Sequence, residues 1–167
     1  MRKRLSILAL FALAFAFVEA AVVVYLHQIL PIEETHKLSY EPPPTILTLP
    51  FIAFLKSPGT LFPDPWLLRI EHIRELATLT MLVSIAWIWG RDKIERFWAF
   101  IFAFSVWDLG YYLFLNRTLG WPNSLWEIDV FFLVPVPWVG PIIVPIVLFS
   151  VLLLVAIPLL MRQRKSE

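Results

Sequence analysis

Five carboxylates stand inside or beside long apolar segments of this chain, where an ionised side chain is costly. They are Glu19, Glu71, Glu75, Asp108 and Asp129. The basic residue expected to be buried with them is Arg74, in the stretch EHIRE that also contains His72. One guanidinium can compensate one or two carboxylates through its forked donors. The remaining carboxylates must therefore be protonated, reach water or bind a cation.

Carboxylates combined with an imidazole can bind divalent metals such as iron, manganese or zinc. The candidate metal ligands are Glu19, His72, Glu75 and Asp108. The di-iron signature of helical bundles is Glu-x-x-His on paired helices, whereas this chain has the reverse order, His72-x-x-Glu75, once. Three hypotheses follow for the acids: a structural network of ion pairs and hydrogen bonds, a divalent-metal or cofactor site, and a proton or ion pathway.

Apolar segments of membrane-spanning length must position these residues. The chain has 167 residues, 59% of them hydrophobic, and a mean hydropathy of +0.76. A spanning helix needs about 20 apolar residues. Four segments qualify, namely residues 5–30, 65–90, 97–115 and 141–161. They lack the period-two alternation of membrane strands. We therefore predict an all-α integral membrane protein with four transmembrane helices in a single domain, residues 1–167.

Composition excludes several function classes. The chain has no cysteine, which excludes disulfides, thiol catalysis and cysteine-bound metals. Its net charge of +1 and the lack of a basic patch on a polar fold argue against nucleic-acid binding. No Gly-rich phosphate loop, nucleophile elbow or zinc-protease helix is found. The expected partners are the lipid bilayer and other membrane subunits or further copies of the chain.

The depths of the charged residues in the four segments predict that they meet. At about 1.5 Å per residue, Glu19 and Glu75 lie roughly 21 Å and 22 Å from the cytoplasmic helix ends, and Asp108 roughly 16 Å. Asp129 enters from the outer side. We expect one buried polar cluster composed of Glu19, Glu71, Arg74, Glu75, Asp108, Tyr112 and Asp129.

Helical spacing supports inward-facing acids. Glu71, Glu75 and Thr78 share one helical face, with Arg74 beside it. In the third segment the shared face contains Ser105, Asp108 and Tyr112. In the first segment, Glu19 is flanked by alanines at four-residue spacing, which allows close helix approach. These alanines are Ala12, Ala16 and Ala20.

Two proline-containing stretches interrupt the helical pattern. The outer loop, residues 31–64, is Pro-rich and contains ILTLPFIAFL, an apolar run too short to span that we expect in the membrane interface. Residues 127–140 precede the last segment, and Pro135, Pro137 and Gly140 break any helix there. This second stretch is interpreted either as a re-entrant element or as a short interfacial helix followed by a turn.

Three basic clusters predict the orientation of the chain in the cell membrane. They are Arg2, Lys3 and Arg4; Arg91, Lys93 and Arg96; and Arg162, Arg164 and Lys165. With four spans they lie on one side, which the positive-inside rule makes cytoplasmic, together with both termini. The alternative for the N-terminus is a signal peptide cleaved after Ala20, but VVVYL continues the apolar run beyond that site.

The stretches FVEAAVVVYL, RELATLTMLVSIAW, WDLGYYLFL and GWPNSLWEIDVFFLVPVPWVGP resemble recurring blocks of small uncharacterised prokaryotic multi-pass membrane proteins. This resemblance covers most of the chain apart from residues 31–64, and it implies no activity. Two function classes are expected. The first is a non-catalytic integral subunit or scaffold with a polar core; the alternative is a membrane-embedded metal-dependent enzyme or a proton or cation carrier.

The orientation gives the first testable prediction. A fluorescent protein fused after residue 167 should fluoresce, because that end is expected in the cytoplasm. Alkaline phosphatase inserted in the 116–126 loop should be active, because that loop is expected outside. A phosphatase-active C-terminus, or an odd number of spans, would contradict the four-span orientation.

Overall fold

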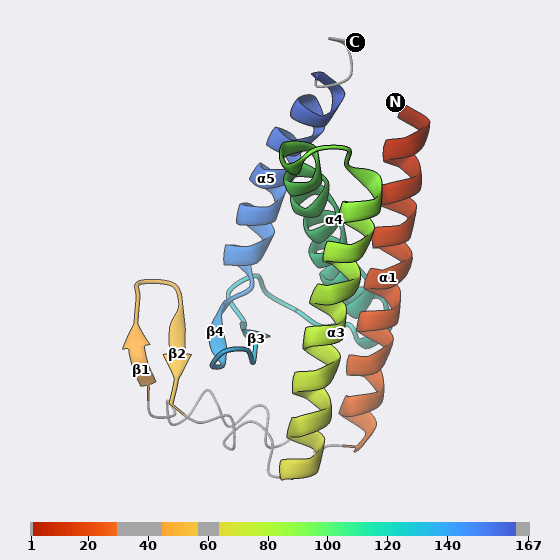
Figure 1. Cartoon of the computed structure of the whole chain (residues 1–167). Helices are drawn as coiled ribbons and strands as arrows, with labels where there is room; N and C mark the ends of the chain where they lie inside the picture. Colours follow the sequence, from red (N-terminus) through yellow and green to blue (C-terminus); the bar gives the residue numbers. More distant parts are fainter. Residues whose placement is uncertain (1, 30–44, 57–63, 163–167) are drawn as a thin grey trace. The chain divides into compact units, whose positions relative to one another are not determined.

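The computed structural model describes residues 2–29, 45–56 and 64–162 (Figure 1). These segments contain four helices: α1 (Arg2–Ile29), α3 (Pro65–Trp89), α4 (Lys93–Leu119) and α5 (Ile143–Arg162). The mostly helical prediction is confirmed, and each helix overlaps one of the four expected segments. Much of the outer loop, residues 30–44 and 57–63, lies outside the described residues.

A small antiparallel sheet corrects the all-α prediction. Its strands are β1 (Thr45–Thr48), β2 (Ala53–Leu55), β3 (Ile128–Phe132) and β4 (Trp138–Pro141). They are ordered β1-β2-β4-β3. The strands have three to five residues each, too few for a readable alternation, and backbone pairing holds them together.

The stretch expected to be a broken or interfacial helix is a β-hairpin. β3 pairs with β4, with Asp129 opposite Gly140 and Ile128 opposite Pro141. The pairing continues outward, because the N–H of Ile142 donates to the Glu127 carbonyl oxygen at 3.0 Å. The alternative of a short interfacial helix at residues 127–140 was therefore wrong. The prolines that end a helix here occupy the turn between two strands and the last residue of β4.

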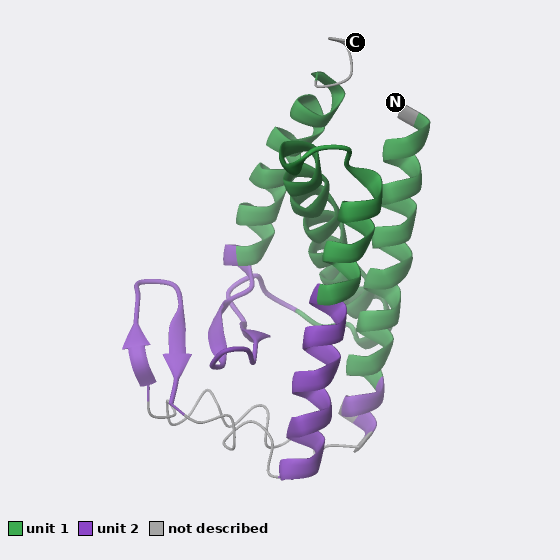
Figure 2. Cartoon of the chain, viewed as in Figure 1, with its two compact units in different colours: residues 1–24, 80–122, 145–167 green, residues 25–79, 123–144 purple. Residues whose placement is uncertain are grey.

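The chain divides into two compact units (Figure 2). Unit 1 contains residues 1–24, 80–122 and 145–167, and unit 2 contains residues 25–79 and 123–144. Unit 1 is composed of helical segments, whereas unit 2 contains the sheet and the first part of α3. Each unit is described by itself below.

In unit 1, α1 and α4 approach closely through small residues. Ala12, Ala16 and Ala20 are fully buried, which confirms the packing role expected from their spacing. A Cβ placed on Gly110 of α4 would lie 2.9 Å from the Ala16 Cβ, so glycine permits this approach. Aromatic pairs flank it, with Phe17 and Phe114 ring centroids 5.3 Å apart in an edge-on arrangement.

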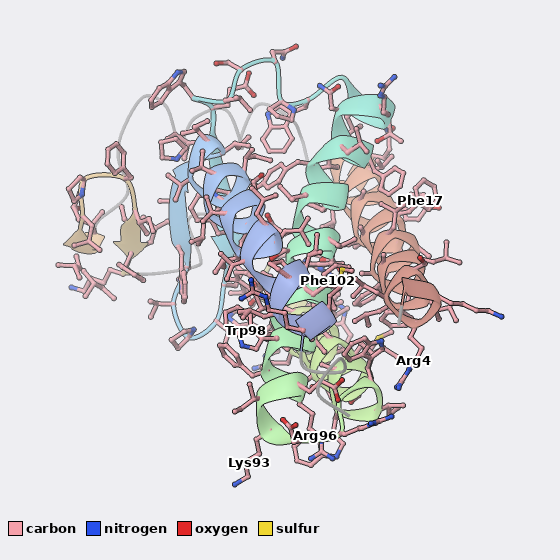
Figure 3. All side chains as sticks on the ribbon, turned by 90° about the horizontal axis from the view of Figure 1, so that it is seen from above. Arg4, Phe17, Lys93, Arg96, Trp98 and Phe102 are labelled. Atoms are coloured by element: carbon pink, nitrogen blue, oxygen red, sulfur yellow. The ribbon has the colours of Figure 1, made fainter. Side chains whose placement is uncertain are left out.

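The buried side of α4 also faces α5. The ring centroids of Phe104 and Phe149 lie 4.9 Å apart. Phe102 is buried and points in among the helices of unit 1, whereas Lys93 points away from them (Figure 3). The face of α4 that contains Phe102 and Phe104 therefore supplies much of the apolar core of this unit.

The turn from α3 to α4 is closed by side-chain capping. Asp92 is the N-cap of α4, and its Oδ1 accepts the N–H groups of Ile94 at 2.8 Å and Glu95 at 2.9 Å. The buried Glu95 accepts the N–H of Arg91 at 2.7 Å. A Cβ on Gly90 would lie 2.5 Å from the Arg96 backbone nitrogen, so the turn requires glycine.

Basic residues expected to mark the cytoplasmic side also make contacts within unit 1. The Arg4 guanidinium donates to the Trp89 carbonyl oxygen at 3.0 Å and lies 5.4 Å from the Trp89 ring centroid. Arg96 donates to the Gly90 carbonyl oxygen at 3.1 Å and lies 4.0 Å from the Trp87 ring centroid. These cation–π contacts join α1 and α4 to the end of α3.

Three described helical segments are long and apolar enough to cross a membrane: Lys3–Leu26, Lys93–Leu119 and Ile143–Arg162. α3, expected as a fourth span, does not meet the same criteria of length and composition. Its first half contains Arg69, Glu71, Arg74 and Glu75, so its uncharged run, residues 76–89, is shorter than the roughly 20 residues that span a bilayer.

The contact between α1 and α4 predicts a compensating pair of substitutions. Gly110→Ala should lower the melting temperature in detergent, because overpacking typically costs about 1–3 kcal/mol. In an Ala16→Gly background, the same change should cost less, because its nearest contact is gone and the next, Leu13 Cδ1 at 3.1 Å, is the end of a flexible side chain. Thermal unfolding of the two single variants and the double variant measures this coupling. Additive effects would contradict the close approach.

Candidate functional site

The residues of the expected polar cluster fall in both units. Unit 1 contains Glu19, Asp108 and Tyr112, and all three are buried. Unit 2 contains Glu71, His72, Arg74, Glu75 and Asp129. Glu71 and Glu75 are buried, whereas His72, Arg74 and Asp129 are half-buried. The structure therefore bears out burial for four of the five acids.

α3 presents its acids on one buried face. Glu71, Glu75 and Thr78 follow one another at helical spacing, and all three are buried. The same stripe continues through the apolar residues Leu82 and Ala86. The shared face predicted from the sequence is thus confirmed, and its polar part occupies the first half of the helix.

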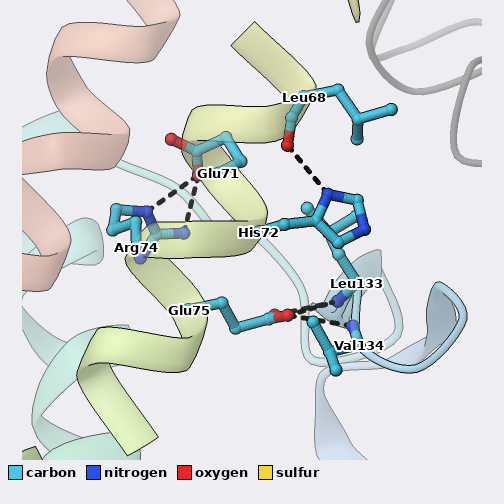
Figure 4. A network of polar contacts seen from close by, with 7 residues as sticks. All are labelled: Leu68, Glu71, His72, Arg74, Glu75, Leu133 and Val134. Carbon is cyan, nitrogen blue, oxygen red and sulfur yellow. Dashed lines mark hydrogen bonds and ion pairs between the residues drawn. The ribbon is translucent and has the colours of Figure 1, made fainter. Parts of the chain in front are cut away.

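Glu71 and Arg74 form an ion pair one turn apart on this helix (Figure 4). Glu71 Oε2 accepts from Arg74 Nη2 at 2.7 Å and from Arg74 Nε at 2.8 Å. This two-point contact confirms the prediction that Arg74 binds at least one of the acids. Arg74 is not fully buried as expected, since 24% of its side chain is exposed.

Glu75 binds the backbone of the turn between β3 and β4 (Figure 4). The N–H of Leu133 donates to both of its oxygens, to Oε1 at 2.8 Å and to Oε2 at 3.1 Å. The N–H of Val134 donates to Oε2 at 2.9 Å. A carboxylate that accepts two successive backbone N–H groups satisfies donors that the strands leave unpaired at this turn.

His72 is bonded to its own helix. Its Nδ1 lies 2.8 Å from the Leu68 carbonyl oxygen, which can only accept, so Nδ1 carries the hydrogen. Among the described residues, no group of three or more His, Asp or Glu side chains is arranged to hold a metal ion. The ligand set proposed from the sequence, Glu19, His72, Glu75 and Asp108, therefore gains no support from the described geometry.

Asp129 has a local role in β3. Its Oδ1 accepts the N–H of Val130 at 2.8 Å, a contact between adjacent residues. Opposite it in the sheet stands Gly140, where a Cβ would overlap the carbonyl oxygen of Phe51. This close approach of the β1–β2 turn to β4 explains the glycine.

In unit 1, the polar face of α4 is buried as predicted. Ser105 Oγ donates to the Ile101 carbonyl oxygen at 2.7 Å, within its own helix. Asp108 and Tyr112 follow on the same face, and Glu19 is buried on α1. Next to Asp108 in the sequence, Trp107 packs against other aromatic rings, with ring centroids 5.2 Å from Phe104 and 6.4 Å from Phe15.

Two polar contacts were missed by sequence reasoning. One is the backbone of Leu133 and Val134 as the partner of Glu75, for which no side chain gives a signal. The other is the buried Glu95, whose signal was available, because Asp92-x-x-Glu95 has the spacing of a helix capping box. Its carboxylate bonds the N–H of Arg91, one residue before the N-cap.

Comparison with known proteins gives no assignment. No protein-family model, curated protein or solved structure matches this chain. The roles of the buried acids are therefore argued from their contacts alone.

The Glu75 contacts predict a graded loss of stability. Glu75→Leu leaves two N–H groups without this acceptor, at about 1–3 kcal/mol for each buried group, so the melting temperature in detergent should fall markedly. Glu75→Gln should lower the melting temperature less, because the amide oxygen can still accept a hydrogen bond from the turn.

Glu127 provides the matched control for this series. It also accepts two backbone N–H groups, of Asn123 at 3.1 Å and Ser124 at 3.2 Å, but in an exposed loop. Glu127→Leu should therefore change the melting temperature little, because water can replace the lost acceptor. Equal effects at Glu75 and Glu127 would contradict a special role for the buried carboxylate.

Proposed function

We propose that this chain is a multi-pass protein of the cell membrane, in which α3 crosses the bilayer together with α1, α4 and α5. One observation carries the proposal: the first half of α3 buries its carboxylates, whereas isoleucines along the helix face outward, which is the reverse of a helix in water. Glu71 and Glu75 are only 3% and 6% exposed, whereas Ile73 and Ile88 are 67% and 78% exposed. In water the apolar face of a helix is the buried one. Lipid reverses that preference, because carboxylates then need the protein interior.

The same inversion accounts for the limited hydropathy of α3. A span can contain charged residues if they face protein and its apolar face meets lipid. With 25 residues, α3 is about 37 Å long at 1.5 Å per residue, longer than the roughly 30 Å hydrocarbon core. Four crossings put both termini on the side of the basic clusters, which the positive-inside rule assigns to the cytoplasm.

Within this membrane protein, we propose a non-catalytic role as an integral subunit or scaffold. The contacts of the α3 acids support it, because these carboxylates bind the chain's own groups. Glu71 binds Arg74, and Glu75 binds the backbone of Leu133 and Val134. Buried acids used in this way stabilise a fold. Partners would be other membrane subunits or further copies, which could cover part of the apolar surface of α1, α3 and α5.

Membrane embedding predicts the behaviour of the chain in cell fractions. It should stay in the membrane pellet after washing with alkaline carbonate and with urea, and it should enter solution with detergent. Release by carbonate alone would contradict the proposal, because peripheral proteins are removed in that way whereas spanning helices are not.

Substitution of Glu19 distinguishes a structural role of the buried acids from a cation-binding role. In the structural case Glu19→Gln should keep most of the thermal stability, because an amide still hydrogen-bonds, and the purified protein should contain no stoichiometric metal. Elemental analysis and melting temperature of both proteins measure this. Stoichiometric metal that is lost in Glu19→Gln, while the fold survives, would establish the cation-binding alternative. Thr48→Val, in exposed strand β1, serves as a control for metal content.

A further inference from the structure

The β1–β2 hairpin leaves both faces of β1 exposed, with apolar side chains among the exposed residues. All four residues of β1 are exposed. Leu47 and Thr48 pair with consecutive residues of β2, so their side chains point to opposite faces, and both are exposed. Ile46, at an irregularity in the pairing, is 59% exposed and Leu47 is 51% exposed. An ordinary surface strand has one covered apolar face and one polar face. β1 therefore lacks an apolar cover on either side among the described residues.

The turn of this hairpin is apolar as well. It is closed by the N–H of Leu49, which donates to the Ile52 carbonyl oxygen at 2.8 Å. The side chains of Leu49 and Phe51 at this turn are exposed. Residues 45–55 contain no charged side chain, and the exposed Lys56 follows at the opposite end of the hairpin. The turn of the hairpin, residues 49–52, which we call its tip, is thus apolar, and the opposite end, its base, has the positively charged Lys56.

Within unit 2, the tip lies near the start of α5. β2 pairs with β4, and the N–H of Leu55 donates to the Pro137 carbonyl oxygen at 2.9 Å. The Phe51 carbonyl oxygen meets the backbone at Gly140, so closely that a Cβ there would overlap it. The apolar helix α5 begins at Ile143, three residues further along the chain. The tip is therefore close to the point where an apolar helix of membrane-spanning length begins.

We propose that the β1–β2 hairpin inserts its tip into the boundary between lipid headgroups and acyl chains, on the side where α5 starts. This inference rests on the proposed membrane embedding. A protein partner docked on a sheet covers one face of it, whereas lipid surrounds an inserted hairpin on both faces. Lipid is thus the occupant that matches a strand exposed on both faces, with Ile46 and Leu47 among its exposed side chains.

Backbone hydrogen bonding limits the depth of insertion. β1 is an edge strand of the described sheet, and an open edge does not occur in contact with the hydrocarbon core. At about 3.3 Å per residue, its four residues reach only about 13 Å. The hairpin therefore stays in the interfacial zone, where water and headgroups can bond its edge, and Lys56 at the base can reach lipid phosphates.

Single cysteines test this insertion directly, because the chain has none of its own. Phe51→Cys reports on the hairpin tip, and Leu49→Cys is a second tip position in case the first variant does not fold. Leu154→Cys, on an exposed position of α5, is the lipid reference. Asn123→Cys, in an exposed loop of unit 2, is the water reference. Each variant is labelled with a nitroxide in phosphatidylcholine nanodiscs, after its melting temperature is shown to match the parent's.

The readout is collision of the nitroxide with oxygen, which concentrates in lipid, and with a water-soluble nickel chelate. Labels at the tip should behave like the label at Leu154, colliding more often with oxygen and less often with the nickel chelate than the label at Asn123. Tip labels that resemble Asn123, while Leu154 reports lipid, overturn the hairpin proposal and leave the embedding intact. A Leu154 label that reports water overturns the embedding itself. Tip labels shielded from both reagents show a protein cover, such as a second copy, and overturn lipid insertion.

Discussion

Burial of the carboxylates on α3 is the constraint on which the polar contacts of unit 2 depend. A buried carboxylate is tolerated when donors surround it, and removing such donors is costly. Glu71 obtains them from Arg74 one turn along the helix. Glu75 obtains them from two consecutive N–H groups in the turn between β3 and β4. The sheet is thereby joined to α3, because this turn is continuous with both β3 and β4.

In unit 1, close apolar packing accompanies the polar contacts. Small residues let α1 and α4 approach at Ala16 and Gly110, and aromatic rings fill the space on either side. At the end of α3, Gly90 permits a tight turn that Asp92 and Glu95 cap. Close packing of this kind suits helices in lipid, where apolar surface alone does not drive association. The buried acids in the first half of α3 and the small-residue packing on α1 both agree with the membrane embedding that we propose.

The sequence predicted the parts of this fold in which residues of one kind form long runs or recur at helical spacing. Long apolar runs indicated the helices, alanines at four-residue spacing indicated the α1 contact, and Glu71, Glu75 and Thr78 indicated the buried face of α3. The sheet was not predicted, because short strands are specified by backbone pairing with distant segments. The partner of Glu75 was missed for the same reason. Every residue except proline has a backbone N–H, so the residue type at Leu133 does not indicate that its N–H binds a carboxylate.

The central claim is that Glu75 serves the fold as the acceptor for the 133–134 turn. Amide hydrogen exchange at Leu133 and Val134 tests it most directly, with the Glu75→Leu variant compared against the parent protein in the same detergent. We predict slow exchange at both amides in the parent and much faster exchange in the variant, while amides in the middle of α4 stay protected in both. Unchanged exchange at Leu133 and Val134 would show that their N–H groups do not depend on Glu75, and would contradict the account.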